Sequence, residues 1–252
     1  MYQEERQKKI LDLLNENKKI SVKELSKILD TSVVTIRSDV KKLQNNDLLV
    51  KTHGGVMVNS YKIDDVIPSN IKFQKHRSEK KKIANLTARF INDGDAIIID
   101  SGSTTLELAR KITQNELTVF TNDLQVALEI STKKNVKLIV TGGSLIPGVY
   151  TMTSPESVET YKQIHVQKLF ISCDALDLEF GISNRDKREV DIKRAMLKSA
   201  DEKYLLVDSS KLNQKVLVKI AELKEFDYLI TDKIPTELKN QIEMLGVKVI
   251  TE

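Results

Sequence analysis

The chain has 252 residues, of which 40% are hydrophobic and 30% are charged, and its formal net charge is +4. This composition is typical of a soluble globular protein, and no run approaches the roughly 18 apolar residues that a membrane helix needs. The first residues contain no apolar segment of a secretory signal, and the one cysteine, Cys173, excludes an internal disulfide and a CxxC metal site. We therefore expect a cytoplasmic protein that has no membrane partner.

Positive charge is unevenly distributed along the chain. Residues 1–60 contain eleven Lys and Arg against eight Asp and Glu, whereas residues 61–252 contain 29 against 28. A positive N-terminal segment is compatible with a polyanionic partner such as nucleic acid, although an excess of three charges is a weak indication by itself. Whether this excess of positive charge indicates nucleic-acid binding therefore depends on the elements predicted for residues 1–60.

Three helices are predicted within the first 45 residues. Apolar residues at helical spacing predict the first over residues 3–15. Ser21 and Glu24 match the capping box, in which two side chains satisfy free amides at a helix start, so the second helix begins there. A third is predicted from Val33 to Asn45, after a turn at residues 30–32 that offers two N-cap side chains. The buried side of the second helix is expected to consist of Leu25, Ile28 and Leu29.

The third helix has two contrasting faces. Ile36, Val40 and Leu43 recur at helical spacing and are expected to face the core. The other side carries small polar groups and cations, which suit insertion into the major groove of DNA, while an ordinary solvated helix face is the alternative. The candidate DNA-contacting residues of this helix are Val34, Thr35, Arg37, Ser38, Lys41 and Lys42.

Two short strands are predicted to follow, at Leu48–Thr52 and Val56–Val58. The glycines of the intervening His53-Gly54-Gly55 turn supply the positive φ that a tight hairpin needs. Three helices followed by a hairpin are the layout of a winged helix-turn-helix, whose wing reaches the adjacent DNA backbone or minor groove. The candidate wing residues are Lys51, Thr52 and His53.

The domain boundaries follow from these elements. The winged helix-turn-helix is predicted to span residues 1–58. Residues 59–72 show no sustained periodicity and contain Pro68, which argues against a continuous helix, so we expect a linker there. Residues 73–252 then form a second domain.

The second domain alternates between strand and helix patterns. Its apolar, strand-like runs are Ala96–Ile99, Leu117–Phe120, Val136–Val140, Lys168–Ser172, Tyr204–Val207, Tyr228–Ile230 and Val247–Ile250. Helical patterns lie between most of them, near residues 103–113, 123–133, 154–164, 187–200 and 235–245. This order predicts an α/β fold with a doubly wound, mainly parallel sheet covered on both faces. Ligands of such sheets bind beyond the carboxyl ends of the strands.

The first of these strands leads into a loop rich in hydroxyls, which precedes a predicted helix. A helix start offers free amides and a partial positive charge, and glycine allows close approach, so the loop is a candidate phosphate cradle. The alternative is plain N-capping by Ser103 or Thr104, and the sequence leaves both open. No GxxxxGK[ST] motif is present, so nucleotide hydrolysis is not expected. The loop consists of Asp100, Ser101, Gly102, Ser103, Thr104 and Thr105.

Other strand ends carry small polar groups and charges too. These are Thr121, Asn122, Gly142, Gly143, Asp174, Asp208 and Lys211. Together they suit a small polyhydroxylated anion. Hydroxyls and amides would hold a phosphate, Lys211 would add charge, and Asp100, Asp174 or Asp208 would accept sugar hydroxyls.

Residues of the N-terminal domain resemble the DNA-binding domain of the DeoR family of bacterial transcriptional regulators. The matching positions include Arg6, Ser21–Leu25, Thr35–Arg37, Asp39 and His53–Gly55. The family usually has a second arginine where this chain has Ser38. Losing an arginine that reads guanine removes about 1–3 kcal/mol of base discrimination. We therefore expect an operator sequence that differs from those of other members.

The second domain resembles the effector domain of the same family. The matching positions are Phe73, Arg77, Ile83–Ala84, Asp100–Thr105, Thr121–Asn122, Gly142–Gly143, Gly181–Ile182, Lys193 and Asp208–Lys211. The resemblance implies a fold similar to the ribose-5-phosphate isomerase and glucosamine-6-phosphate deaminase group. It also adds Lys193 to the effector site. In the segment Tyr150–Ser154 the chain departs from many members, which carry a glycine there.

The resemblance implies a repressor of sugar-utilisation genes that a phosphorylated sugar releases from duplex operator DNA. Because paired half-sites need paired heads, we expect a homodimer or homotetramer. Neither a catalytic residue, nor a metal site, nor a cofactor is expected.

Two other functions have to be weighed against this one. The first is a sugar-phosphate isomerase or deaminase with an N-terminal accessory domain, since Asp174 and Asp177 lie near the candidate phosphate site, but no acid pairs with them. The second is a binding module that never contacts DNA and uses its basic head for protein contacts.

Overall fold

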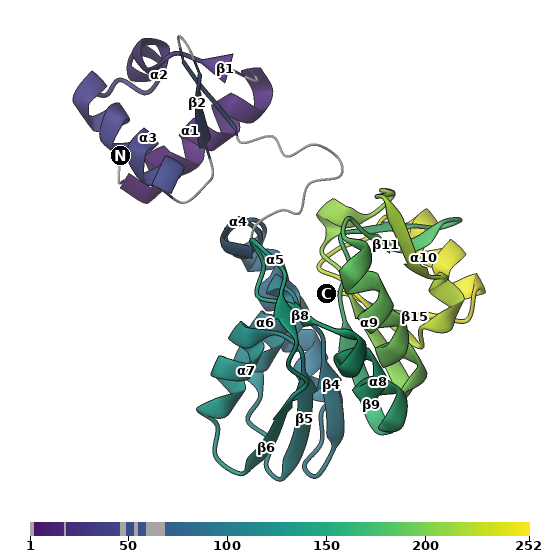
Figure 1. Cartoon of the computed structure of the whole chain (residues 1–252). Helices are drawn as coiled ribbons and strands as arrows, with labels where there is room; N and C mark the ends of the chain where they lie inside the picture. The colour runs from purple at the N-terminus through teal and green to yellow at the C-terminus, as the bar shows by residue number, and fades with distance from the viewer. Residues whose placement is uncertain (1–2, 18, 46–48, 53–54, 59–68) are drawn as a thin grey trace. The chain divides into compact units, whose positions relative to one another are not determined.

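The computed structural model describes residues 3–17, 19–45, 49–52, 55–58 and 69–252. The chain divides into two compact units, residues 1–62 and 63–252 (Figure 1). Within the described ranges no helix is both long and apolar enough to span a bilayer.

The first unit contains three helices and a small sheet. The helices are α1 (Gln3–Asn17), α2 (Val22–Ile28) and α3 (Val33–Asn45). The strands β1 (Lys19–Ile20), β2 (Leu49–Thr52) and β3 (Gly55–Val58) pair antiparallel in the order β1-β3-β2. The predicted winged layout of three helices and a hairpin is therefore present. The strand β1 was not predicted, because two residues are too few to show a period.

The sequence patterns locate the helices of this unit well. Ile36, Val40 and Leu43 are buried on the inner side of α3, and the capping box of Ser21 and Glu24 is formed at the start of α2. The expectation for Ile28 was wrong, since it is 56% exposed. It is the last residue of the seven-residue helix α2, and the chain turns away there through Asp30, which has a φ of 45°.

A charged pair joins the first and third helices. The Arg6 guanidinium donates from Nε to Asp39 Oδ2 over 2.5 Å, and Gln3 Nε2 donates to Asp39 Oδ1 over 3.0 Å. Burial alone would raise the pKa of Asp39, but the hydrogen bonds from Arg6 and Gln3 outweigh it and hold that pKa below its usual value. Two positions that match the family pattern thus fix α1 against α3.

The second unit is built on a seven-stranded sheet in which every neighbouring pair is parallel. In spatial order its strands are β15 (Lys248–Ile250), β14 (Tyr228–Ile230), β12 (Ala200–Leu206), β9 (Val166–Ile171), β4 (Ala96–Ile99), β5 (Leu117–Thr121) and β6 (Val136–Val140). Each of the seven predicted strand runs overlaps one of these strands. The predicted mainly parallel sheet is therefore confirmed.

Helices cover both faces of this sheet and enclose two apolar cores. One core includes α5 (Arg77–Thr87), α6 (Ser103–Lys111) and α7 (Leu124–Ser131). The other includes α8 (Pro155–Gln163), α9 (Lys187–Lys198) and α10 (Thr236–Met244). Short 3-10 helices lie at Ala88–Phe90, Ser209–Lys211 and Leu223–Glu225.

The strand order changes direction between β4 and β9. From β4 the chain adds β5 and β6 on one side, and from β9 it adds β12, β14 and β15 on the other. Such a reversal leaves the crossover helices diverging above the carboxyl ends of the two central strands. This edge is therefore the place in the fold where a ligand is expected.

Three features of this unit depart from the predictions. The strands β10 (Ala175–Asp177), β11 (Gly181–Asn184) and β13 (Val218–Ala221) form a separate antiparallel sheet, and β7 (Ser144–Leu145) pairs with β8 (Met152–Thr153). The predicted linker is also too long, because its last residues belong to helix α4 (Ser69–Gln74). Pro68 directly precedes this helix, where a proline is tolerated, so it marks a start rather than a break.

Candidate functional site

The outer face of α3 is exposed and cationic. Arg37, Ser38, Lys41 and Lys42 are exposed, and Val34 is 75% exposed. The one carboxylate within α3, Asp39, is turned inward against Arg6. This face therefore presents positive charge with no competing carboxylate of its own helix.

The remaining predicted DNA-contacting residues lie beside this face or outside the described ranges. Ser32 is the N-cap of α3, because its Oγ accepts from the Thr35 amide over 3.1 Å. The Thr35 hydroxyl is 2.8 Å from the same oxygen. The Thr35 side chain is half-buried rather than fully exposed on the outer face of α3. Lys51 and Thr52 lie in β2, opposite Val56 and Gly55, and His53 lies outside the described residues.

The second candidate site is centred on a buried ion pair at the point where the strand order reverses. Lys193 of α9 is 2% exposed and Asp100, directly after β4, is 0% exposed. The Lys193 ammonium binds Asp100 Oδ2 and donates to the Ser172 carbonyl over 3.0 Å. The Ser172 amide donates to the same carboxylate oxygen over 3.1 Å. Asp100 therefore orients Lys193 and joins β4 to β9 through Oδ2, a structural role that the sequence did not predict.

The start of α6 lacks a side-chain cap. Its N-cap is Gly102, with a φ of 146°, and no side chain bonds to the first-turn amides. The N-capping alternative, by Ser103 or Thr104, was therefore wrong. The Thr105 hydroxyl donates to the Gly102 carbonyl over 2.9 Å, whereas Thr104 Oγ1 is buried without any hydrogen-bond partner. Free amides and an unused hydroxyl at a helix start form an arrangement that binds anions.

Two more of the predicted site residues hold buried oxygens that accept no hydrogen bond from the described residues. Asn122 Oδ1, after β5, and Asp208 Oδ2, after β12, make no hydrogen bond. Buried polar atoms that make no hydrogen bond are uncommon, and a bound water molecule or ligand is the usual explanation. Both follow strands at the edge that carries Asp100. Their acceptors suit the hydroxyls of a bound molecule.

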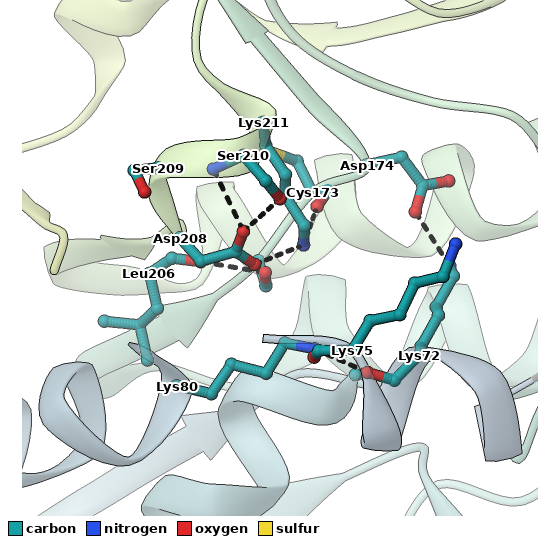
Figure 2. A network of polar contacts seen from close by, with 12 residues as sticks. Lys72, Lys75, Lys80, Cys173, Asp174, Leu206, Asp208, Ser209, Ser210 and Lys211 are labelled. Carbon is teal, nitrogen blue, oxygen red and sulfur yellow. Dashed lines mark hydrogen bonds and ion pairs between the residues drawn. The ribbon is translucent and has the colours of Figure 1, made fainter. Parts of the chain in front are cut away.

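Two lysines converge on the end of β9. Lys211 donates to the Cys173 carbonyl over 2.6 Å, one residue after the Ser172 carbonyl that Lys193 binds. Lys211 is also 3.9 Å from Asp208 Oδ2. Residues from α9, from the end of β9 and from the segment after β12 therefore lie close together. Figure 2 shows three of them, Lys211, Asp208 and Cys173.

Asp174 is held by two cations that the sequence analysis did not assign to the site. Its Oδ1 is 2.7 Å from Lys72 Nζ, and its Oδ2 is 3.5 Å from Arg185 Nη1. Burial would raise the pKa of Asp174, but Lys72 and Lys211 outweigh it and hold this pKa well below the usual range. Lys72 lies in the predicted linker, where no pattern pointed to a site.

Gly143, which follows β6, is needed for close approach of the chain. Gly143 has a φ of 115°, and a Cβ there would lie 2.7 Å from the Thr153 carbonyl carbon. The adjacent segment is bound to the strand end before α7, because Asn122 Nδ2 donates to the Met152 carbonyl over 3.0 Å. The chain from Gly143 to Thr153 therefore forms a wall beside the residues that follow β5.

Asp123, which follows Asn122, provides a prediction about stability. Its Oδ1 caps α7 by accepting from the Gln125 and Val126 amides, while burial raises its pKa from 3.8 to about 6. A raised pKa means that the stabilisation is complete below about pH 4 and is lost as the pH rises through about 6. Asp123→Asn retains the acceptor without the charge. We expect it to stabilise the protein at pH 7.5 by about 3 kcal/mol, and not at pH 4.

Urea unfolding at both pH values measures this difference. Asp186→Asn is the control, because Asp186 also caps a helix but Arg188 lowers its pKa, so that variant is expected to destabilise at pH 7.5. An effect of Asp123→Asn that does not change with pH would contradict the prediction.

A metal centre does not compete with these two sites in the described part of the chain. This part of the chain holds no group of three or more His, Cys, Asp or Glu side chains arranged for a metal ion. A shallow hollow lined by Glu116–Thr118 and Asn135–Lys137 lies at the amino ends of β5 and β6, away from the carboxyl edge.

Comparison with known proteins identifies both units. Residues 6–62 match the model of the DeoR-like helix-turn-helix domain, and residues 75–233 match the DeoR C terminal sensor domain. The uncharacterized HTH-type transcriptional regulator YulB of Bacillus subtilis is 34% identical over 90% of this chain and 88% of its own length. A putative aga operon transcriptional repressor of Escherichia coli O157:H7 is 30% identical over 98% and 93%. The L-fucose operon activator of Escherichia coli K12 is 28% identical over 90% and 94%.

Solved structures are less similar. The translation initiation factor eIF-2B of Pyrococcus horikoshii OT3 has a TM-score of 0.44 and 16% identity over 62% of this chain and 63% of its own. Ribose 5-phosphate isomerase A of Methanocaldococcus jannaschii has a TM-score of 0.39 and 17% identity over 55% of each chain. These similarities are too low to say anything about activity. The relatives are transcriptional regulators rather than enzymes, so the isomerase or deaminase alternative is not supported, and the chain belongs to the DeoR family of DNA-binding transcriptional regulators.

Proposed function

We propose that this regulator represses sugar-utilisation genes and that a phosphorylated sugar, bound at the carboxyl edge of the sheet, lowers its affinity for operator DNA. The observation that carries the proposal is the start of α6, which has an N-cap without a side chain and the unpartnered Thr104 hydroxyl. Free amides at a helix start are a common phosphate site. Lys211 and Lys193 lie at the adjoining strand end.

The relatives support the sugar part of this proposal. One of them is named as an activator of an L-fucose operon and another as a repressor of an aga operon. The acceptors on Asn122 and Asp208 provide the partners that sugar hydroxyls need. The named relatives include both a repressor and an activator. We propose repression on the family resemblance alone.

Operator binding by α3 sets the expected assembly and location. A head of this kind covers one half-site, so a homodimer or homotetramer would place two heads on a paired operator. A cytoplasmic location is proposed on the same ground, since operator DNA is the proposed partner. We retain residues 1–58 as the DNA-binding domain and extend the proposed sensor to residues 69–252, so that the linker ends before α4.

The proposal is tested by operator binding in the presence of sugar phosphates. Wild-type protein first selects its operator from a random DNA pool, and fluorescence anisotropy then measures its affinity with ribose 5-phosphate, glucose 6-phosphate, glucosamine 6-phosphate or fructose 1-phosphate. We expect one of them to weaken operator binding by about 5–150-fold, the usual range for allosteric coupling. The same sugars without phosphate are expected to have a much smaller effect.

Thr104→Val connects this response to the proposed site. Valine keeps the shape of threonine and removes a buried hydroxyl that bonds to none of the described residues, so the free energy of unfolding should not fall. The concentration of sugar phosphate needed for half of the effect should rise about tenfold, which corresponds to one lost hydrogen bond to a charged group. A wild-type protein that ignores every sugar phosphate, or a variant that responds at wild-type concentrations, would refute the proposal.

A further inference from the structure

Helix α4, the first described element of the second unit, is attached to the candidate effector site by side chains. Lys72 Nζ is 2.7 Å from Asp174 Oδ1, and Figure 2 shows these two side chains pointing toward one another. The Phe73 ring stacks on Tyr150 with 6.2 Å between centroids. Tyr150 belongs to the wall that lies beside the strand end after β5. The helix therefore contacts residues that follow two different strands of the sheet.

A buried lysine holds the end of the same helix. Lys80 of α5 donates to the Lys72 and Lys75 carbonyls, both over 2.5 Å. These carbonyls are at the C-terminal end of α4 and just beyond it, where a helix has no internal donors left for them. Helix α4 has only six residues, and a helix of this length is not stable by itself. Its position therefore depends on a few side-chain contacts.

The Lys72–Asp174 pair is charged and largely shielded from water. The side chain of Asp174 is 8% exposed and that of Lys72 is 22% exposed. Burial would lower the pKa of Lys72, but the charges of Asp174 and Glu189 outweigh it and raise that pKa. A shielded charge is expensive to leave without a partner. Arg185, 3.5 Å from Asp174 Oδ2, is already beside this pair, and a further charge brought to it has a large influence on the Lys72–Asp174 contact.

The pair also belongs to the cation cluster of the proposed site. Lys211 is close enough to Asp174 to lower its pKa, and it binds the carbonyl of the preceding residue, Cys173. An anion held by Lys211 would attract the Lys72 ammonium and repel the Asp174 carboxylate. Both effects weaken the contact that attaches α4 to the end of β9.

We infer that Lys72 is a coupling residue, for which an anionic effector and Asp174 compete, so that occupancy of the site releases α4. The inference rests on the proposed function of this site and adds how effector binding is transmitted from the site to α4. A ligand shifts a conformational equilibrium only through contacts that differ between the two states. The exchange of partners at Lys72 is such a contact. In the sequence, residues 59–68 alone separate α4 from the last described strand of the DNA-binding unit.

The full-length protein tests the inference through two substitutions and a control. Lys72→Met keeps the apolar stem and removes the charge, and Asp174→Asn keeps the shape and removes the acceptor charge. Lys82→Met is the control, because Lys82 forms a 2.7 Å pair with Glu252 on the same unit but both side chains are about half exposed. Hydrogen exchange of the amides in residues 69–74 reports the attachment of α4, and it needs no ligand.

The expected results separate coupling from binding. Both Lys72→Met and Asp174→Asn should speed exchange in α4 about tenfold relative to Lys82→Met. Asp174→Asn without ligand should bind the selected operator as weakly as the wild type does with its sugar phosphate. For Lys72→Met, the response at saturating sugar phosphate should fall from about 5–150-fold to less than about 2-fold, because coupling and not only affinity is lost.

Two outcomes would overturn the inference. One is α4 exchange in Lys72→Met equal to that in Lys82→Met, and the other is a full saturating response by Lys72→Met. If no sugar phosphate affects the wild type, the proposed function fails separately. The comparison of operator affinity between Asp174→Asn and Lys82→Met then decides the inference, and equal affinities would refute it.

Discussion

Replacing Lys193 by methionine is expected to destabilise the sensor unit by about 3–5 kcal/mol, the usual cost of removing one partner of a buried ion pair. Asp100 is fully buried, and its Oδ2 would retain the Ser172 amide alone. The Ser172 carbonyl would lose the Lys193 ammonium as well. The cost arises mainly from the carboxylate that is left behind, and urea unfolding of the full chain at pH 7.5 measures it.

A double variant separates this cause from a loss of packing. Lys193→Met combined with Asp100→Asn removes both charges, so most of the lost stability should return. Lys198→Met, at the exposed end of the same helix, should change stability by less than about 0.5 kcal/mol. If the double variant were as unstable as Lys193→Met alone, the buried charge would not be the cause.

Replacing Arg37 and Lys41 together by alanine is expected to weaken operator binding on the order of 100-fold. Both side chains are exposed on the outer face of α3. A base contact by arginine contributes about 1–3 kcal/mol, and each lost phosphate contact reduces the salt slope by about one. Anisotropy titrations at several salt concentrations distinguish the two contributions, since a base contact changes sequence preference and a phosphate contact changes the slope.

Lys9→Ala provides the matched control, because Lys9 is an exposed cation of α1 in the same unit and lies on a different helix from the proposed DNA face. It should leave both operator affinity and salt slope near the wild-type values. An Arg37 and Lys41 double variant that bound like Lys9→Ala would show that α3 does not contact DNA. Circular dichroism of each variant checks that the unit remains folded.

Local patterns predicted most of the framework because they report local physics. The bounds of α3 and of β4, β6 and β14 follow from apolar periodicity and run length, and the capping box marks the residue before α2. These signals arise within one element. The parallel order of the strands then places Asp100, Asp174, Asp208 and Lys211 at one edge of the sheet. Their position at this edge could therefore be predicted without knowing which residues they contact.

Features that depend on distant partners were not predictable in this way. Lys72 contacts Asp174 across 102 positions of sequence, and nothing around Lys72 distinguishes it from a linker lysine. The strands β10, β11 and β13 are short, and β11 pairs with β13 only after an intervening helix and strand. The ion pair of Asp100 was not predicted for the same reason. Its partner Lys193 is on a helix 93 positions later.

The reversal of strand order between β4 and β9 also sets when the sensor can be completed during synthesis. Asp100 and the α6 start are made early, but Asp174, Lys193 and Lys211 emerge only after the first half of the sheet. At about 5–20 residues per second, translation needs roughly 7–30 s to pass from the end of the first unit to Lys211. A nascent chain thus has a complete first unit well before it has all the residues of the proposed effector site.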